Sequence, residues 1–262
     1  MTNERAAPRS RALGWVLLAL LLYFGLLAAS APASVLGWAL AHATHKGVTL
    51  EGPSGGFWRG RASKLNTVAP WGRTHSFDRL HWELVAARLL TAELAFRVTI
   101  ADSRLQGSGQ IALQPNCVRA SDVVFDLPAS TLKDFRPELL ASGLVGKLTL
   151  RSQNFSLDRG NYSGGATLAW RNAGSSLIGN LGGDYVAHIS GSERRVEFRV
   201  ETLAGSLQVD GKGAWSTEAG LSFDGTVRSL AGDRSAHLDS LKQFGPEIAG
   251  GIHRVSFATM FR

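Results

Sequence analysis

Cysteine is nearly absent from this chain, because Cys117 is the only one among 262 residues. A single thiol cannot close an internal disulfide, and it excludes a zinc site built from several cysteines. Proline is also scarce, at eight residues, and no proline- and serine-rich linker divides the chain after its N-terminal part. Hydrophobic residues make up 44% of the chain, which excludes a disordered protein. They do not form a series of long apolar runs, and cysteine is scarce, so the composition also excludes a multi-span transporter and a disulfide-rich miniprotein.

The basic excess is dispersed rather than concentrated. The chain has 28 Lys and Arg against 21 Asp and Glu, a formal charge of +7. Residues 1–12 contain three arginines and one glutamate, and residues 42–262 hold the other 25 basic and 20 acidic residues, which leaves that part at +5. The longest run of basic residues is Arg194-Arg195. No stripe of positive charge suited to a phosphate backbone is visible, so we expect no nucleic-acid partner.

One long apolar run stands near the N-terminus. Residues 13–31 carry no formal charge, and as a helix they would span about 28 Å, close to the hydrocarbon core of a bilayer. The arginines before the run predict a cytoplasmic N-terminus. We therefore expect a cytoplasmic segment at 1–12, a transmembrane signal-anchor and juxtamembrane segment at 13–41, and a periplasmic β-rich domain at 42–262. This organisation describes a single-pass protein of the cell inner membrane.

A cleaved signal peptide is the alternative for the same segment. Ala31-Pro32-Ala33 has the A-x-A form of a cleavage site. The apolar run is longer than the usual 7–15 residues of a signal peptide, and apolar residues continue to Leu40, so a retained anchor is favoured. Both interpretations export residues 42–262.

The body of the chain has the period of β-strands. Apolar and polar residues alternate in residues 196–201 and 221–228, which is typical of strands with one buried and one wet face. One wet face favours antiparallel pairing. Similar alternation occurs at residues 94–100, 123–127, 148–150, 155–157 and 166–170. We predict a mainly β fold: an elongated, curved antiparallel sheet after the N-terminal helix, treated as one domain.

A few short helices are also expected, at residues 77–94, 128–141 and 235–244. Ser130 would cap the second, and Gly143 would follow its end. These helices are too short to cover the apolar face of so large a sheet. The sheet must therefore curl on itself or pack in two layers, which is the favoured alternative, or present that face to a partner or a lipid.

Residues that could carry chemistry are not grouped in any recognisable pattern. Two of the seven histidines, His42 and His45, could share a helical face, but no carboxylate or cysteine lies near them at ligand spacing. The chain has no zinc-protease, phosphate-loop or nucleophile-elbow motif. We expect no catalytic, cofactor-binding or metal-binding residues and no enzymatic activity, while a hydrolase whose site assembles from distant residues remains the alternative.

Residues 51–62 combine glycines with an aromatic pair. We expect a tight hairpin whose second strand starts at Phe57, so that Phe57 and Trp58 point to opposite faces. One ring would lie in the core and the other would reach toward the membrane or a partner. The alternative, that both rings are structural, is favoured.

Several stretches together resemble the type II secretion system protein N family. Residues 55–62 (GGFWRGRA) are similar to its "G-x-x-W-x-G-x-A" stretch. In the same order along the chain, further similar stretches lie at residues 168–173 (LAWRNA), 202–213 (TLAGSLQVDGKG), 221–225 (LSFDG) and 241–245 (LKQFG). Phe244 stands in the last of these where the family pattern suggests an aliphatic residue.

The resemblance implies a non-enzymatic accessory component of the inner membrane, in the machinery that exports folded periplasmic proteins across the outer membrane. Its implied partners are other type II secretion components and the inner membrane, with no cofactor. A likeness to β-rich periplasmic proteins of the AsmA type suggests an alternative: a lipid-handling protein whose partner is a lipid held in an apolar groove.

Overall fold

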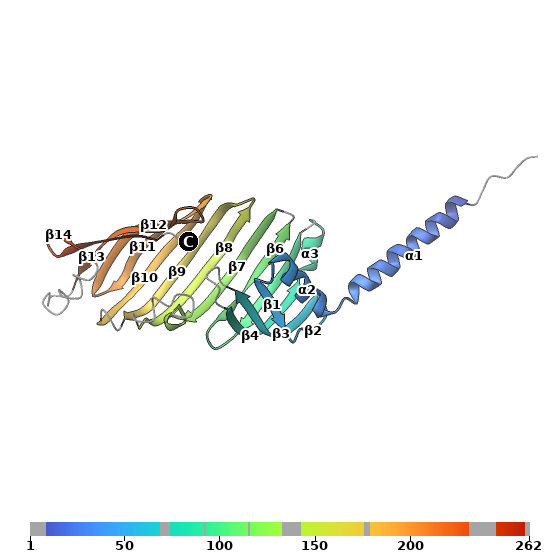
Figure 1. Cartoon of the computed structure of the whole chain (residues 1–262), viewed down its shortest axis with the longest axis horizontal. Coiled ribbons are helices and arrows are strands. Elements are labelled where there is room, and N and C mark those ends of the chain that lie inside the picture. The colour runs from blue at the N-terminus through green and yellow to red at the C-terminus, as the bar shows by residue number, and fades with distance from the viewer. Residues whose placement is uncertain are drawn as a thin grey trace, which may run out of the picture.

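The computed structural model describes residues 9–68, 74–91, 93–114, 116–132, 143–175, 179–230 and 245–259. The chain forms one elongated antiparallel sheet, with α1, α2 and α3 at its N-terminal end (Figure 1). The helices are α1 (Arg9–Ala29), α2 (Ala33–Ala43), α3 (Ala86–Leu89) and the 3-10 turn η1 (Ala129–Thr131). The predicted mainly β, antiparallel fold is confirmed.

The strands follow one another across the sheet in nearly their order along the chain, so most neighbours are joined by hairpins. The sheet is open, with β1 at one end and β14 at the other. The short strand β2 pairs only with β3 and lies outside this strand order. The strands are β1 (Val48–Glu51), β2 (Ser54–Gly55), β3 (Arg59–Val68), β4 (Thr74–Leu84), β5 (Leu94–Ala101), β6 (Gln106–Gln114), β7 (Cys117–Pro128), β8 (Val145–Asp158), β9 (Asn161–Ser175), β10 (Gly179–Glu193), β11 (Arg195–Gly205), β12 (Leu207–Ser216), β13 (Gly220–Ser229), β14 (Glu247–Ala249) and β15 (Ile252–Thr259).

The N-terminal segment forms two helices rather than one. α1 ends at Ala29, and α2 starts at Ala33 after Pro32. Among the residues that the structure describes, no helix is both long enough and apolar enough to cross a membrane. The transmembrane helix expected within residues 13–41 is therefore not confirmed.

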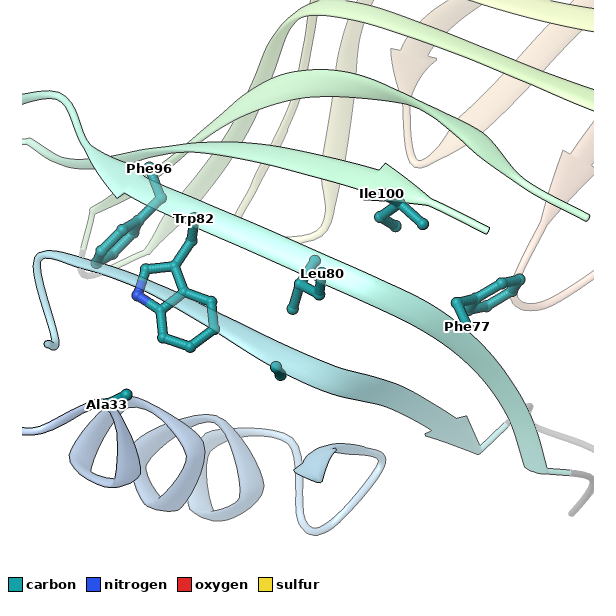
Figure 2. Packing of buried hydrophobic residues seen from close by; sticks show 7 residues of the cluster. Ala33, Phe77, Leu80, Trp82, Phe96 and Ile100 are labelled. Carbon is teal, nitrogen blue, oxygen red and sulfur yellow. The ribbon is translucent and has the colours of Figure 1, made fainter. Parts of the chain in front are cut away.

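The main core lies where α2 covers the first strands. Figure 2 shows Ala33 of α2 facing Trp82 and Leu80 of β4, with Phe96 and Ile100 of β5 in the same cluster. Trp82 is 3% exposed, and its indole N–H donates a hydrogen bond to the carbonyl of Phe57 at 3.0 Å. A short apolar helix thus closes the apolar face at this end of the sheet.

The helix predicted over residues 77–94 is wrong. The segment forms β4, the single turn α3 and the start of β5. Arg79 has a φ of +56°, and the pairing of β3 with β4 passes from Lys64–Asp78 directly to Ala62–Leu80. This irregularity keeps Phe77 and Leu80 on the inward face. The predicted helix rested on the spacing of Leu80, Leu84, Ala87 and Leu90. Leu80 and Leu84 lie on one face of β4, where four residues also separate neighbours on a helix face, and Ala87 and Leu90 belong to α3 and its end.

The other predicted helices are only partly described. Ala129–Thr131 forms η1, within which Ser130 lies, and no side chain caps its start. Residues 133–142, which include the rest of the predicted helix at 128–141, and residues 231–244 lie outside the described part of the chain.

The hairpin expected at residues 51–62 is present with a shifted start. β2 pairs with β3 through Ser54–Arg61 and Gly55–Gly60, so the second strand begins at Arg59 rather than at Phe57. The Phe57 ring packs against the core and meets Phe96 edge-to-face, with ring centroids 5.8 Å apart. The rings of Phe57 and Trp58 do not point to opposite faces as predicted, because they meet edge-to-face with their centroids 5.0 Å apart.

A buried carboxylate fastens the turn between β5 and β6. Asp102 is 2% exposed and accepts hydrogen bonds from the backbone N–H groups of Asp78 and Arg104, each at 2.7 Å. Burial pushes the pKa of Asp102 upward, but the two N–H groups and the Arg104 guanidinium outweigh it and hold the pKa below its usual value.

Replacing Asp102 with asparagine is expected to lower the free energy of unfolding by about 1.5–3 kcal/mol at neutral pH. The asparagine side chain has one carbonyl oxygen, which can accept from only one of the two backbone N–H groups, and its NH₂ group would face the other. Because the folded pKa lies below the unfolded one, the carboxylate stabilises above the unfolded pKa and loses its contribution as pH falls through the folded value. In urea titrations the difference between variant and parent should therefore shrink below about pH 4. A difference that stays constant to pH 2 would contradict this account, and Asp158→Asn, at an exposed residue, serves as the control.

Candidate interaction surface

The strand register gathers the apolar side chains on one face of the sheet. In the central strands, Leu150 of β8 lies opposite Leu168 of β9, which lies opposite Ala187 of β10, which lies opposite Val200 of β11. A parallel row joins Leu148, Trp170 and Tyr185. Because every strand is antiparallel to its neighbour and side chains alternate, one apolar face runs from β1 to β15. We call this surface the apolar face.

Aromatic rings continue the apolar face at the C-terminal end. Phe198 of β11 stacks on Phe223 of β13 with ring centroids 6.2 Å apart, and Phe223 stacks on Phe257 of β15 at 5.6 Å. The rings of Phe198 and Phe223 reach each other across Gly213 of β12, where a Cβ would overlap the Phe198 ring. Glycine in this strand is thus required by the close approach of the phenylalanine rings.

Much of the apolar face stays accessible within the described residues. Near one end of β6–β8, a row of aliphatic side chains (Leu113, Val118 and Leu157) is 36–45% exposed. Phe257 on β15 is 47% exposed. Outside the N-terminal core, the buried residues Leu207 and Val227 form a smaller cluster with Trp170, Val209 and Val255. The sheet is a single layer, so the expected two-layer covering is not observed among these residues.

The opposite face is polar and its acidic residues are paired. Asp224 bonds to Arg254 at 2.9 and 3.2 Å, and Glu201 lies 3.1 Å from His188. A shallow hollow of about 750 Å³ on this face is lined by His188, Arg199, Lys212 and three serines (Ser190, Ser222 and Ser256). In this hollow the hydroxyl of Ser222 donates to the carbonyl of Ala214 at 3.4 Å, and His188 lies against Glu201.

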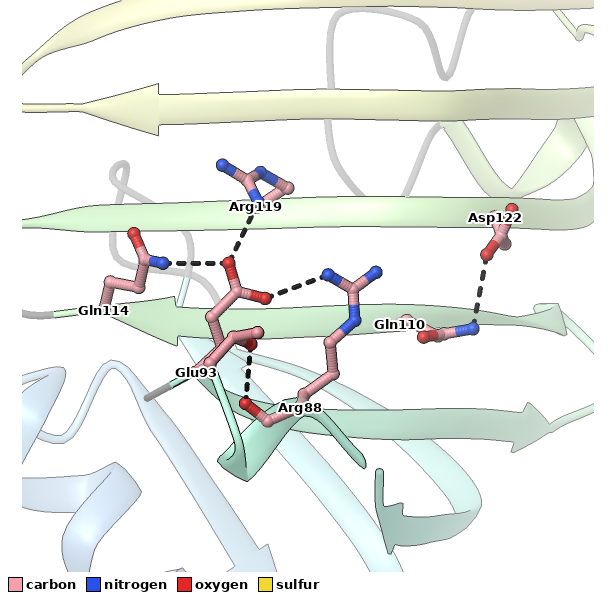
Figure 3. Close-up of polar contacts among 7 residues, drawn as sticks. Arg88, Glu93, Gln110, Gln114, Arg119 and Asp122 are labelled. Carbon is pink, nitrogen blue, oxygen red and sulfur yellow. Dashed lines mark hydrogen bonds and ion pairs between the residues drawn. The ribbon is translucent and has the colours of Figure 1, made fainter. Parts of the chain in front are cut away.

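A second polar cluster stabilises the segment that connects β4 to β5. Glu93, 6% exposed, accepts hydrogen bonds from Arg88 at 3.0 Å, Arg119 at 3.1 Å and Gln114 at 2.8 Å (Figure 3). The carboxylate thereby ties α3 to β6 and β7. The sequence did not predict this cluster, because no local pattern brings Glu93 close to Arg119, 26 positions further along the chain.

The residues singled out for metal binding do not form a site. His42 lies on α2 and stacks against Trp38, while His45 follows the helix with a φ of +50°. In the described ranges, no three histidine, cysteine, aspartate or glutamate residues are grouped so that they could hold a metal ion.

Comparison with protein families connects this surface to a known class. The family described as type II secretion system (T2SS), protein N matches residues 46–256, which span the sheet from just before β1 into β15. The chain belongs to the type II secretion system protein N family. No curated protein and no solved structure matches it.

The stretches that resemble the protein N family fall on the sheet. Residues 55–62 join β2 to β3, residues 168–173 lie in β9, and residues 202–213 cross the hairpin from β11 to β12. Residues 221–225 lie in β13, and most of the stretch at 241–245 lies outside the described residues. The described stretches that resemble the family therefore fall on strands and hairpins.

Proposed function

We propose that this member of the protein N family is a non-enzymatic accessory component of the type II secretion machinery, attached to the inner membrane. It assists the export of folded periplasmic proteins across the outer membrane through protein–protein contacts of its sheet. The observation that carries this proposal is the family match over residues 46–256, because those residues build the sheet as far as the middle of β15, with most of its accessible apolar face.

The apolar face supports contact with partners. A soluble monomer seldom leaves a continuous apolar surface of several strands open to water. Here the open rows lie on regular strands whose register is fixed on both sides, so the surface is rigid before any partner binds. Preformed surfaces of this kind lose little conformational freedom on association.

Attachment to the inner membrane is supported by the side chains of α1. Eleven large apolar side chains between Trp15 and Leu27 are each at least 46% exposed, and none of them belongs to either buried cluster of the sheet. Apolar side chains so numerous and so exposed favour a lipid environment over water. We propose residues 1–12 on the cytoplasmic side and the sheet in the periplasm.

Retention of the N-terminal segment is supported by contacts at Ala31–Ala33. Ala33 is 2% exposed within the main core, and the carbonyl of Ala31 accepts a hydrogen bond from the N–H of Phe57 at 2.8 Å. Pro32 also bridges to Gly56. A peptidase would have to withdraw this stretch from the folded body, so the intact mass of the membrane-extracted protein should include α1. A mass that begins at or after Ala33 would contradict retention.

The secretion assay tests the function itself. In-frame deletion of the gene should reduce the secreted fraction of type II cargo and leave that cargo folded in the periplasm. The full chain supplied in trans should restore secretion. Normal secretion and unchanged assembly of the other components after deletion would contradict the proposal.

A second candidate function is favoured by the same apolar face. A lipid acyl chain would suit the unbroken rows of aliphatic and aromatic side chains between β6 and β13. This candidate predicts that native mass spectrometry of the gently extracted protein finds a stoichiometric phospholipid. If no phospholipid is bound and deletion of the gene still reduces secretion, the lipid-handling function is contradicted and the secretion function stands.

A further inference from the structure

The link between β4 and β5 presents leucine side chains to the outside. Leu90, which caps α3, is 91% exposed, and Leu89 is 46% exposed. Both belong to the short segment that joins two core strands, β4 and β5. An isolated exposed leucine is ordinary, but two adjacent leucines at a helix end form a local apolar tip.

This tip is held in place by strong polar contacts. The N–H groups of Thr91 and Glu93 both donate to the carbonyl of Arg88 at 3.1 Å, and the Arg88 guanidinium bonds to Glu93 (Figure 3). Glu93 is in turn bonded to β6 and β7 through Gln114 and Arg119. The leucines are therefore presented by a turn that Glu93 holds, and they cannot fold back onto the core without breaking the contacts of this buried carboxylate.

The tip adjoins the helix that we propose to be in the membrane. A hollow of about 510 Å³ is lined by Gly25 and Ala29 of α1 and by the apolar side chains of Trp58, Leu84 and Leu89. The ion-paired side chains of Arg59 and Glu83 also line it. In Figure 1, α3 lies at the end of the sheet from which α1 projects. Apolar surface thus continues from the exposed side chains of α1, such as Leu26 at 72%, to the exposed leucines beside α3.

We infer that Leu89 and Leu90 insert into the surface of the phospholipid bilayer and seat the N-terminal end of the sheet on the membrane. The inference rests on the proposed membrane attachment of α1 and assigns a second contact to the body itself. Trp58 beside the tip suits the same region, because its ring is amphipathic and tryptophan favours the membrane–water interface. The contact would restrict how the sheet tilts relative to the membrane.

The test uses the full chain in vesicles of phosphatidylethanolamine and phosphatidylglycerol. In a Cys117→Ser background, an environment-sensitive fluorophore is attached to Leu90→Cys, to Leu22→Cys in α1, or to Thr217→Cys in the exposed turn between β12 and β13. Emission at positions 22 and 90 should shift to the blue and be quenched by lipid-borne nitroxide. Position 217 should respond only to aqueous iodide.

The three positions separate the possible failures. If position 22 is quenched by lipid while position 90 behaves like position 217, the bilayer contact of the tip is overturned and the attachment through α1 stands. If position 22 is also in water, the proposed attachment fails. Shielding of position 90 in native membranes but not in vesicles would assign the tip to a protein partner and overturn the inference.

Discussion

Replacing Trp82 with alanine is expected to lower the free energy of unfolding by about 3–5 kcal/mol, the usual range for a buried tryptophan. The ring is 3% exposed and fills the space between α2 and the sheet, so alanine would leave a cavity there. The substitution also removes the donor to the Phe57 carbonyl at 3.0 Å. Of the described residues, those in this core are the largest buried group, so the loss should affect the whole N-terminal half of the sheet.

Trp38→Ala is the matched control. It removes the same side chain from the outer side of α2, where Trp38 is 64% exposed and contacts the His42 ring. Urea unfolding in detergent, followed by circular dichroism, should show a large shift for Trp82→Ala and a small one for Trp38→Ala. Equal shifts would show that α2 does not cover the sheet as described.

Replacing Leu168 with aspartate is expected to abolish secretion while leaving most of the sheet folded. Leu168 lies in the central row of the apolar face, between Leu150 and Ala187. A carboxylate there would have to be desolvated when a partner or lipid covers the face, which is strongly unfavourable. Secretion should therefore be lost although the free energy of unfolding changes little.

The adjacent residue provides the control for this variant. Thr167 points to the polar face, between Arg151 and His188, where an added carboxylate meets positive charge. Thr167→Asp should secrete normally, and Leu168→Ser, which adds no charge, should give an intermediate loss. Normal secretion by Leu168→Asp, with unfolding unchanged, would show that this part of the apolar face contacts nothing.

The strand pattern was predictable because it is local. Residues 196–201 alternate apolar and charged side chains without interruption, and β11 forms there with that alternation. The segment at 77–94 resembles a helix because Leu80 and Leu84, on one face of β4, are four residues apart, as neighbours on a helix face are. Ala87 and Leu90 continue this spacing but belong to the single turn α3 and its end.

The candidate surface was only partly predictable. The alternation of apolar and polar residues along the strands predicted that one face of the sheet is apolar. Which rows stay open depends on long-range register, such as Val118 opposite Leu157, and on where α2 packs. The Glu93 cluster and the exposed leucine tip depend on the same long-range contacts, so neither could be read from local residue types.

Site-specific photo-crosslinking on the apolar face tests the central claim most directly. A benzophenone side chain is placed at Leu168 or, as the control, at Thr167, and cells with active secretion are irradiated. We predict that position 168 crosslinks to another type II secretion component, identified by its peptides, and that position 167 does not. Crosslinks from position 167 alone, or from position 168 to phospholipid alone, would contradict a protein-binding role for the apolar face.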